Sequence, residues 1–482
     1  MVNTMKKTLK KVLKKEHIFY LGIIISFLIL STIISLKHEY WPDETNAWLI
    51  ARDSSIVELF TKYLRTDGHP ALFHLIIKAF QFFGLSYTNF RVISILFSTL
   101  GVAVFVFKSK FKWYLKALLP FTYFIFYQYT VITRGYCLIL LLLSLIATIW
   151  EKKNEKCFLY TLLLVLLLSL ESYTFLIAGS LFLLWIIDYI KEYKQNKKHN
   201  PKLLVCFAIL FLSFLLTTIY VFPRNSNTYV FSRVTTFTLD RVFLSPYQLK
   251  YVIGDIICVL ILTFITYVYI KEKSLKKAIE LLIISLPVVG YLTLFYCSPW
   301  HFGIILILAL FIIWIHELNT KIYINIFLLL VCIIQISWSV KSSIYDYKET
   351  YCPTKEVAEF LKPYLNKNYR IMGHTFYEEA INAYYEKNIF YNMEQDIGFR
   401  YLTKNSIYYN YKYDTDSIIK ESPDILVTTY LGKKSEKNKD VLDYNKLQEK
   451  YDKYEFKAYT YFENTKYANM TAYVFIKKGL VK

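Results

Sequence analysis

Long apolar stretches alternate with short polar segments from about residue 18 to about residue 340. Several of these stretches approach or exceed the roughly 18–20 residues that a helix needs to cross a hydrocarbon core of about 30 Å. From about residue 341 the apolar runs are short and lie among Lys, Glu, Asp, Asn and Tyr, as in a water-soluble domain of ordinary size. The pattern therefore predicts a polytopic α-helical membrane protein with a soluble C-terminal domain.

Lysine clusters between the apolar stretches indicate how the chain threads the membrane. Lys and Arg concentrate in cytoplasmic loops, so the six lysines between positions 6 and 15 place the N-terminus in the cytoplasm. We expect about eleven spans, near residues 17–36, 90–107, 117–132, 134–150, 158–170, 173–188, 203–222, 251–270, 278–296, 302–316 and 322–340. With this number every lysine cluster is cytoplasmic, and residues 345–482 form an extracytoplasmic domain.

Residues 70–84 fit two interpretations, a short span or a helix on the outer surface. His74, Lys78 and Gln81 are spaced four and three residues apart, so they share one helix face. A lipid-facing span would not carry such a polar stripe, and a further span here would place the next two lysine clusters outside. We therefore expect a surface helix, preceded by another that begins at the capping-box sequence Ser55-Ile-Val-Glu58.

The C-terminal segment mixes helical and strand patterns, which favours an α/β domain. Helices are expected over residues 354–365 and 440–454. Strands are expected over residues 369–373, 424–429, 456–462 and 471–477, with the last two as a closing pair. The segment has no GxGxxG motif, phosphate-binding loop or metal-ligand spacing, so its pattern assigns no chemistry.

Composition argues against two classes of function. The formal net charge is +20, from 57 Lys and Arg against 37 Asp and Glu, but the lysines cluster in loops that the topology makes cytoplasmic. The charge therefore does not require a nucleic-acid partner. The seven cysteines lie mostly in apolar runs without a CxxC pair, and they predict neither a metal site nor a disulfide framework.

The first outer loop, residues 37–89, carries two adjacent carboxylates, Asp43 and Glu44, just beyond the first span. Adjacent side chains diverge, so one can act as a general base while the other binds a hydroxyl, a cation or a positive neighbour. A structural role is as consistent with the pattern, because Pro42 followed by two acids suits the start of a helix. Both interpretations are open from the spacing alone.

Three arginines are expected on the same outer side. Arg134 lies in a turn between two apolar runs, where it can bind a phosphate or pair with an acid of the first outer loop. Arg224 and Arg233 belong to a polar outer loop, residues 223–250, which a solvated surface also explains.

Two histidines are further candidates on that side. His69 follows Asp67 and Gly68 at the expected start of the second surface helix, whose free N–H groups favour phosphate. His301, beside Trp300, can be a ligand at the end of a span. For both residues an ordinary position at the membrane interface is the competing explanation.

Three motifs, Trp41-Pro-Asp-Glu44, Gly68-His-Pro-Ala-Leu-Phe73 and Arg134-Gly-Tyr136, resemble the GT-C superfamily of membrane glycosyltransferases. The nearest likeness is to the protein O-mannosyltransferase-like enzymes and the lipid A aminoarabinose transferases, and it covers about residues 18–340. The resemblance implies a catalytic membrane domain over residues 1–344 with two surface helices in its first outer loop. Where family members more often read His-Pro-Pro, this chain reads His-Pro-Ala from position 69.

The resemblance also implies an activity on the outer face of the cell membrane. A sugar would move from a polyprenyl-phosphate donor to a hydroxyl of a lipid, polysaccharide or protein, with inversion and with Asp43 as the base. The residues expected to bind substrate are Glu44, His69, Arg134, Tyr136, Arg224, Arg233 and His301. No cofactor is required, because a lipid phosphate does not demand the divalent metal that a nucleotide-sugar enzyme often uses. A divalent metal stays unassigned, with Glu44 and His301 as two candidate ligands.

Two other functions share the lipid-linked substrate. A transporter or flippase of a lipid-linked sugar needs polar groups on both sides of the membrane midplane, whereas the polar groups here are one-sided. A polysaccharide polymerase or ligase would move a whole glycan in place of one sugar.

Overall fold

The computed structural model describes residues 15–222, 274–294, 299–374, 376–393, 396–399, 414–431, 441–462, 465–469 and 471–480, with isolated positions between 263 and 270. These residues form two compact units. The first contains residues 15–33, Val92–Ile219 and the described part of Arg233–Val340. The second contains Ile34–Arg91 and the described parts of Tyr220–Ser232 and Lys341–Lys482, so the segment that follows α2 groups with the C-terminal residues.

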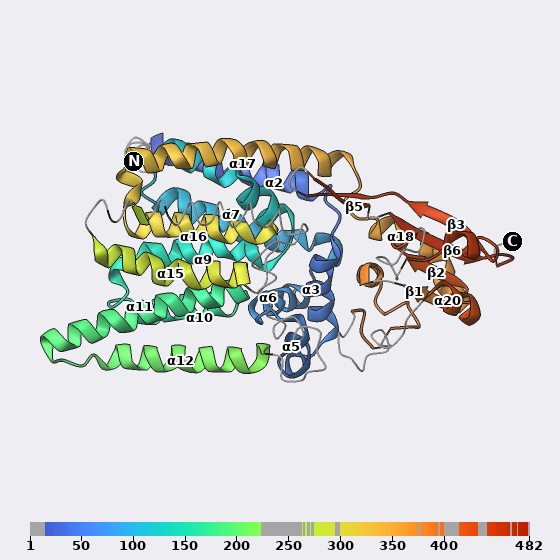
Figure 1. Ribbon diagram of the computed structural model, residues 1–482, viewed down its shortest axis with the longest axis horizontal. Coiled ribbons are helices and arrows are strands. Elements are labelled where there is room, and N and C mark those ends of the chain that lie inside the picture. Colours follow the sequence, from blue (N-terminus) through green and yellow to red (C-terminus); the bar gives the residue numbers. More distant parts are fainter. Residues whose placement is uncertain are drawn as a thin grey trace, which may run out of the picture. The chain divides into compact units, whose positions relative to one another are not determined.

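The first unit consists of helices (Figure 1). Its long helices are α2 (Lys15–Ser35), α7 (Arg91–Lys108), α11 (Ser172–Asn196), α12 (Pro201–Val221), α15 (Leu275–Leu294) and α17 (Ile322–Lys348), some of which extend a few residues into the second unit. Shorter helices are α8 (Trp113–Leu118), α9 (Ile139–Ile149), α10 (Cys157–Leu168) and α16 (Phe302–Ile315). Single 3-10 turns are η3 (Leu119–Phe121), η5 (Gly135–Leu138), η6 (Trp150–Lys152), η9 (Pro299–His301) and η10 (Leu318–Thr320), and η4 (Tyr123–Val131) is a π-helix.

Six helical stretches among the described residues are long and apolar enough to cross a membrane: Lys15–Ser35, Tyr87–Lys108, Gly135–Lys152, Ser172–Asn196, Pro201–Val221 and Ile322–Lys348. Large apolar side chains on their outward faces are exposed, among them Ile29 (52%), Phe211 (67%) and Leu330 (56%). Exposed apolar area of this extent fits contact with lipid and not with water. The prediction of a mostly helical chain is confirmed, and six of its helical stretches have the length and composition of membrane spans. The predicted span 251–270 lies outside the described residues apart from isolated positions.

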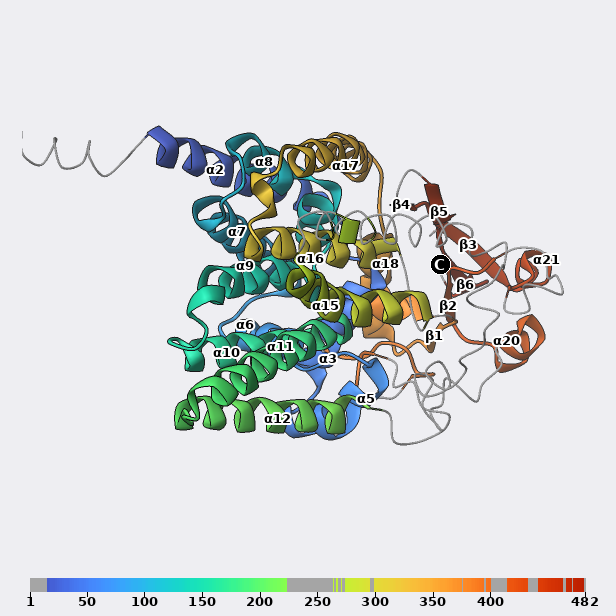
Figure 2. The same ribbon diagram turned by 60° about the vertical axis from the view of Figure 1, so that its left-hand side comes forward.

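Helix α16 lies at the centre of the first unit. All of residues 303–314 are buried, and the helix packs against α9, α15 and η4 (Figures 1 and 2). Close approach requires Gly303, because a Cβ there would lie 2.6 Å from the phenol of Tyr129. The π-helix η4 is buried along its whole length. π-Helices are rare, and they frequently lie at functional sites.

The second unit begins with the helices of residues 42–89. They are α3 (Pro42–Asp53), α4 (Ile56–Glu58), the π-helical η1 (Leu59–Tyr63), α5 (Leu64–Asp67), α6 (Leu72–Phe82) and the 3-10 turn η2 (Tyr87–Asn89). The predicted capping box is confirmed: the Glu58 N–H donates to the Ser55 hydroxyl, and the Ser55 N–H donates to the Glu58 carboxylate at 2.9 Å. Gly68, at φ +77°, ends α5 and does not cap the next helix, which begins at Leu72.

The polar stripe of α6 packs against α3. Lys78 Nζ donates to the carbonyl oxygens of Ala51, at 2.6 Å, and Ser54, and Gln81 Nε2 donates to the Trp48 carbonyl at 3.3 Å. The last carbonyl groups of a helix lack partners within the helix, so the lysine supplies what the end of α3 needs. This contact explains why an otherwise apolar helix carries the stripe.

The C-terminal part of the second unit contains a four-stranded sheet in the order β1-β2-β6-β3 (Figure 2). Its strands are β1 (Ile371–Gly373), β2 (Ile425–Thr428), β6 (Ala472–Lys477) and β3 (Tyr451–Phe456); β1 and β2 are parallel, and β6 is antiparallel to both its neighbours. A separate hairpin joins β4 (Tyr459–Phe462) and β5 (Thr465–Asn469). The helical elements are α18 (Thr354–Leu361), η11 (Lys362–Lys367), η12 (Phe376–Tyr384), α20 (Thr415–Glu421) and α21 (Tyr444–Leu447).

Apolar residues cover both faces of this sheet. Ile371, Val427 and Val474 pack with Val357 of α18 on one face, and Met372 and neighbouring residues pack on the other. An α/β arrangement is therefore present.

Two details of the predicted C-terminal elements are wrong. A helix over residues 440–454 is replaced by the four-residue α21 and by β3, which begins at Tyr451. The predicted partner of residues 471–477 was 456–462, but β6 pairs with β3 and β2. Strand pairing across long sequence separations decides this segment and overrides its local helical pattern.

Candidate functional site

Helix α3 starts at Pro42, directly after Trp41, so that Asp43 and Glu44 occupy its first turn. Proline suits this position because it has no N–H to leave unpaired. Glu44 Oε2 accepts a hydrogen bond of 2.8 Å from the Trp41 N–H and is fully buried. The structural interpretation of the acidic pair therefore applies to Glu44, which caps the helix.

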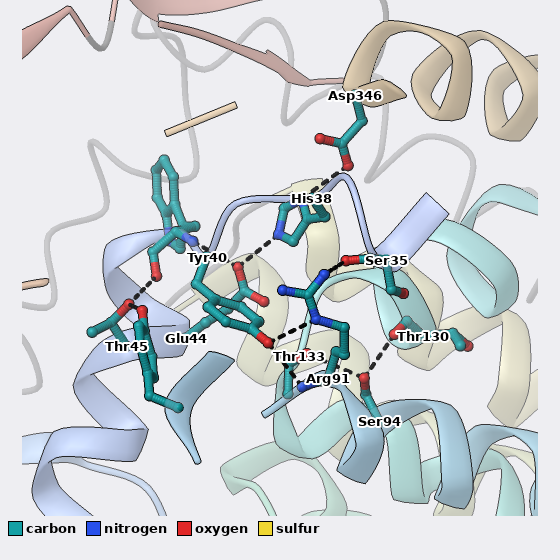
Figure 3. Close-up of polar contacts among 12 residues, drawn as sticks. Ser35, His38, Tyr40, Glu44, Thr45, Arg91, Ser94, Thr130, Thr133 and Asp346 are labelled. Atoms are coloured by element: carbon teal, nitrogen blue, oxygen red, sulfur yellow. Dashed lines mark hydrogen bonds and ion pairs between the residues drawn. The ribbon is translucent and has the colours of Figure 1, made fainter. Parts of the chain in front are cut away.

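His38 lies between two buried carboxylates of the second unit (Figure 3). Its Nε2 is 3.0 Å from Glu44 Oε2, and its Nδ1 is 2.8 Å from Asp346 Oδ2, near the end of α17. Burial opposes a charge on the ring, but Asp346 and then Glu44 outweigh it and raise the pKa of His38 to about 10. At neutral pH the ring is an imidazolium that donates from both nitrogens.

This arrangement ties the start of α3 to the end of α17. A carboxylate near a helix C-terminus is unfavourable without a positive partner, and His38 supplies that charge to Asp346. The same ring holds Glu44, so it also sets where α3 begins. The two predicted carboxylates consequently differ: Glu44 faces the interior, whereas Asp43 is only partly buried.

Arg91 contacts the residues on either side of His38 in the sequence, Ser35 and Tyr40. Its Nε and its backbone N–H each donate to the Tyr40 hydroxyl at 3.0 Å, and its guanidinium donates to the Ser35 carbonyl at the end of α2 (Figure 3). Tyr40 is buried, and the guanidinium also lies 5.0 Å from the centre of its ring. These hydrogen bonds fix Ser35 and Tyr40, and therefore the segment between α2 and α3 that contains His38.

Comparison with known proteins adds no relative: no protein-family model matches the chain, and a search of curated proteins finds no match either. The functional argument therefore rests on these residues and their geometry.

In the first unit the structure brings together three predicted residues, Arg134, Tyr136 and His301. The Tyr136 hydroxyl is 3.1 Å from His301 Nε2, and the Arg134 guanidinium lies 5.6 Å from the centre of the Tyr136 ring. His69 is partly buried in the second unit. The predicted residues Arg224 and Arg233 are outside the part of the chain that the structure describes.

The described residues contain no group of three or more His, Cys, Asp or Glu side chains that could hold a metal ion. The two candidate ligands have other partners: Glu44 is bound to His38, and both ring nitrogens of His301 lie within hydrogen-bond distance of tyrosine hydroxyls. In this structure the atoms of Glu44 and His301 that could bind a metal therefore contact other side chains.

The sequence pattern did not point to three residues of these sites: His38, Asp346 and Tyr173. The hydroxyl of Tyr173 lies 2.9 Å from His301 Nδ1. Asp346 follows the last apolar stretch and His38 follows the first, and each is an ionisable residue beside a span, which is a signal for a role. Nothing in the pattern pairs residues 308 positions apart. Tyr173 has no distinguishing signal, because it is one of 44 tyrosines.

Proposed function

We propose that this protein is an inverting membrane glycosyltransferase of the GT-C type. It transfers one sugar from a polyprenyl-phosphate donor to a hydroxyl of a lipid, polysaccharide or protein acceptor. One observation carries the proposal: the first turn of α3 has a buried carboxylate, Glu44, that anchors the helix, beside a partly exposed one, Asp43, just beyond the first membrane helix.

The proposed chemistry uses Asp43 as a general base. The carboxylate takes the proton of the acceptor hydroxyl while the hydroxyl oxygen attacks C1 of the sugar. The bond between C1 and the phosphate oxygen breaks, and the bonding electrons leave with the polyprenyl phosphate. The leaving lipid phosphate is already ionised, so no general acid is needed, and a positively charged side chain beside it stabilises its charge.

The proposed topology has about eleven spans in the cell membrane, with the N-terminus in the cytoplasm and the C-terminal α/β domain outside. The six long apolar helices and the distribution of lysines support it. The partners are then the lipid-linked sugar, the surrounding membrane lipids and the acceptor, with no nucleic acid.

The test compares envelope glycans of cells that lack the gene with those of cells that carry it again as wild type, Asp43→Asn or Glu58→Gln. Glu58 is a matched control, because it is an exposed carboxylate in the cap of the neighbouring helix. The wild type and E58Q should restore one missing sugar. D43N should not, although it is present in the membrane at the same level and has the same thermal stability.

Each other outcome is informative. Restoration of the sugar by D43N would remove Asp43 as the base, and identical glycans with and without the gene would refute the proposed activity. Loss of a whole glycan would indicate a polymerase or ligase. Movement of a labelled lipid-linked sugar across proteoliposomes without a transfer product would indicate a transporter.

A further inference from the structure

His301 lies between two tyrosine hydroxyls in the core of the first unit. Its Nδ1 is 2.9 Å from the Tyr173 hydroxyl and its Nε2 is 3.1 Å from the Tyr136 hydroxyl. All three side chains are buried, with at most 3% exposed. A neutral imidazole has one N–H and one acceptor nitrogen, so one tyrosine donates to the ring and the ring donates to the other. The bridge joins η5, η9 and α11, which are far apart in the sequence.

The Tyr136 ring is also held on its face. The Tyr129 ring stacks on it, with centroids 5.0 Å apart and planes at 27°, and the Tyr129 hydroxyl donates to the Trp300 carbonyl at 2.7 Å. Gly303 leaves the space that Tyr129 fills, since a Cβ at that position would lie 2.6 Å from the phenol. Tyr136 is therefore fixed both at its hydroxyl, by His301, and across its plane, by Tyr129.

Arg134 rests beside this fixed ring, with its guanidinium carbon 5.6 Å from the ring centre. It is partly exposed, whereas Tyr136 is buried. The backbone just before it is held as well, because the Ser94 hydroxyl donates to the Thr130 carbonyl at 2.8 Å and lies 3.2 Å from the Thr133 hydroxyl (Figure 3). Both the chain leading to Arg134 and the aromatic surface beside it are thus rigid.

A guanidinium is a planar fork that binds two oxygens of a phosphate at once, so its orientation matters as much as its charge. A long side chain that is already oriented loses less conformational entropy when it binds.

We infer that Tyr173 and His301 are positioning residues, which through Tyr136 hold the Arg134 guanidinium in the orientation that binds a phosphate oxyanion. The inference rests on the proposed function for the source of that phosphate, a prenyl lipid phosphate. Tyr173 would touch neither the lipid nor the sugar.

The test measures binding of farnesyl phosphate to the full-length protein in nanodiscs, with uncharged farnesol as the comparison for partition into lipid. Wild type should prefer the phosphate. Arg134→Gln should weaken phosphate binding by about 10–100-fold, and Tyr173→Phe by about tenfold, with farnesol binding unchanged in both.

The matched control is Tyr160→Phe. Tyr160 is also fully buried in the first unit, and its hydroxyl has no hydrogen-bond partner among the described residues. Removing that hydroxyl should leave phosphate binding at the wild-type level. Tyr173→Phe keeps the ring, so a normal melting temperature together with weaker phosphate binding would separate positioning from a general loss of structure.

Wild-type phosphate affinity in Y173F would overturn the positioning role, and so would an equal loss for phosphate and farnesol. Unchanged binding in R134Q would overturn the phosphate site itself. Phosphate binding that depends on Arg134 and Tyr173 in a protein without sugar transfer would uphold the inference and refute the glycosyltransferase. Sugar transfer together with phosphate binding that does not depend on Arg134 or Tyr173 would uphold the glycosyltransferase and refute the inference.

Discussion

Replacing His38 should strongly destabilise the second unit. The substitution His38→Gln removes the cation that lies between Glu44 and Asp346, whose side chains are fully buried. Breaking a buried ion pair by removing one partner typically costs about 3–5 kcal/mol, because the remaining charge stays buried without compensation. The free energy of unfolding of a typical protein is about 5–15 kcal/mol, so this loss would be a large fraction of it.

The pKa of His38 provides a second route to the magnitude. It rises from 6.5 to about 10 on folding, and each pKa unit corresponds to about 1.4 kcal/mol. The full contribution, about 5 kcal/mol, is present below pH 6.5, where the ring is protonated in both states. As the pH rises above 6.5 the unfolded state loses its proton first, so the contribution falls to about 4 kcal/mol at pH 7 and vanishes above pH 10.

The assay is thermal unfolding of the full-length protein in nanodiscs between pH 6 and pH 10, followed by tryptophan fluorescence. Wild type should lose thermal stability steadily from pH 7 to pH 10. H38Q should unfold at a lower temperature at pH 7 and show a smaller change across that range. His199→Gln is the control, because His199 is exposed and should behave like wild type in both respects. A melting temperature and pH dependence for H38Q equal to those of wild type would refute the ion-pair reasoning.

Two further substitutions test the packing and capping that support the two units. Gly303→Ala should cost about 1–3 kcal/mol, because the new methyl group displaces Tyr129. Gly290→Ala, whose new methyl group meets no described atom within 4 Å, should cost much less. Similar melting temperatures for the two variants would contradict the packing argument. Ser55→Ala should cost about 1 kcal/mol by removing the cap of α4, as measured by thermal unfolding, and a melting temperature no lower than that of wild type would count against this cap.

Much of the helical organisation was predictable because apolar length is a strong local signal. A helix begins within a few residues of the expected positions at Lys15, Arg91 and Pro201, among others. The capping box at Ser55 is as local, since it depends on four consecutive residues and is present as predicted. Strands β1, β2 and β6 also lie within the expected ranges, whereas residues 451–454 of β3 have a local helical pattern, and pairing with β6 determines their conformation.

The candidate sites divide in the same way. Asp43, Glu44, Arg134, Tyr136 and His301 stand out in the sequence because charged or polar residues beside apolar stretches are costly unless they have a role. Their partners do not stand out, because a hydrogen bond between distant residues leaves no periodic trace.

By itself the sequence determined that the chain is mostly helical, that several helices are long and apolar enough to span a membrane, and that polar residues gather in residues 37–89. Apolar length and lysine placement are read locally, so they need no tertiary information. Only the tertiary structure decided that Glu44 binds His38 at the start of α3 and that Asp346 binds the other nitrogen of the same ring. It also decided that His301 bridges the hydroxyl groups of Tyr173 and Tyr136. These contacts depend on the positions of helices in space, which local patterns do not encode.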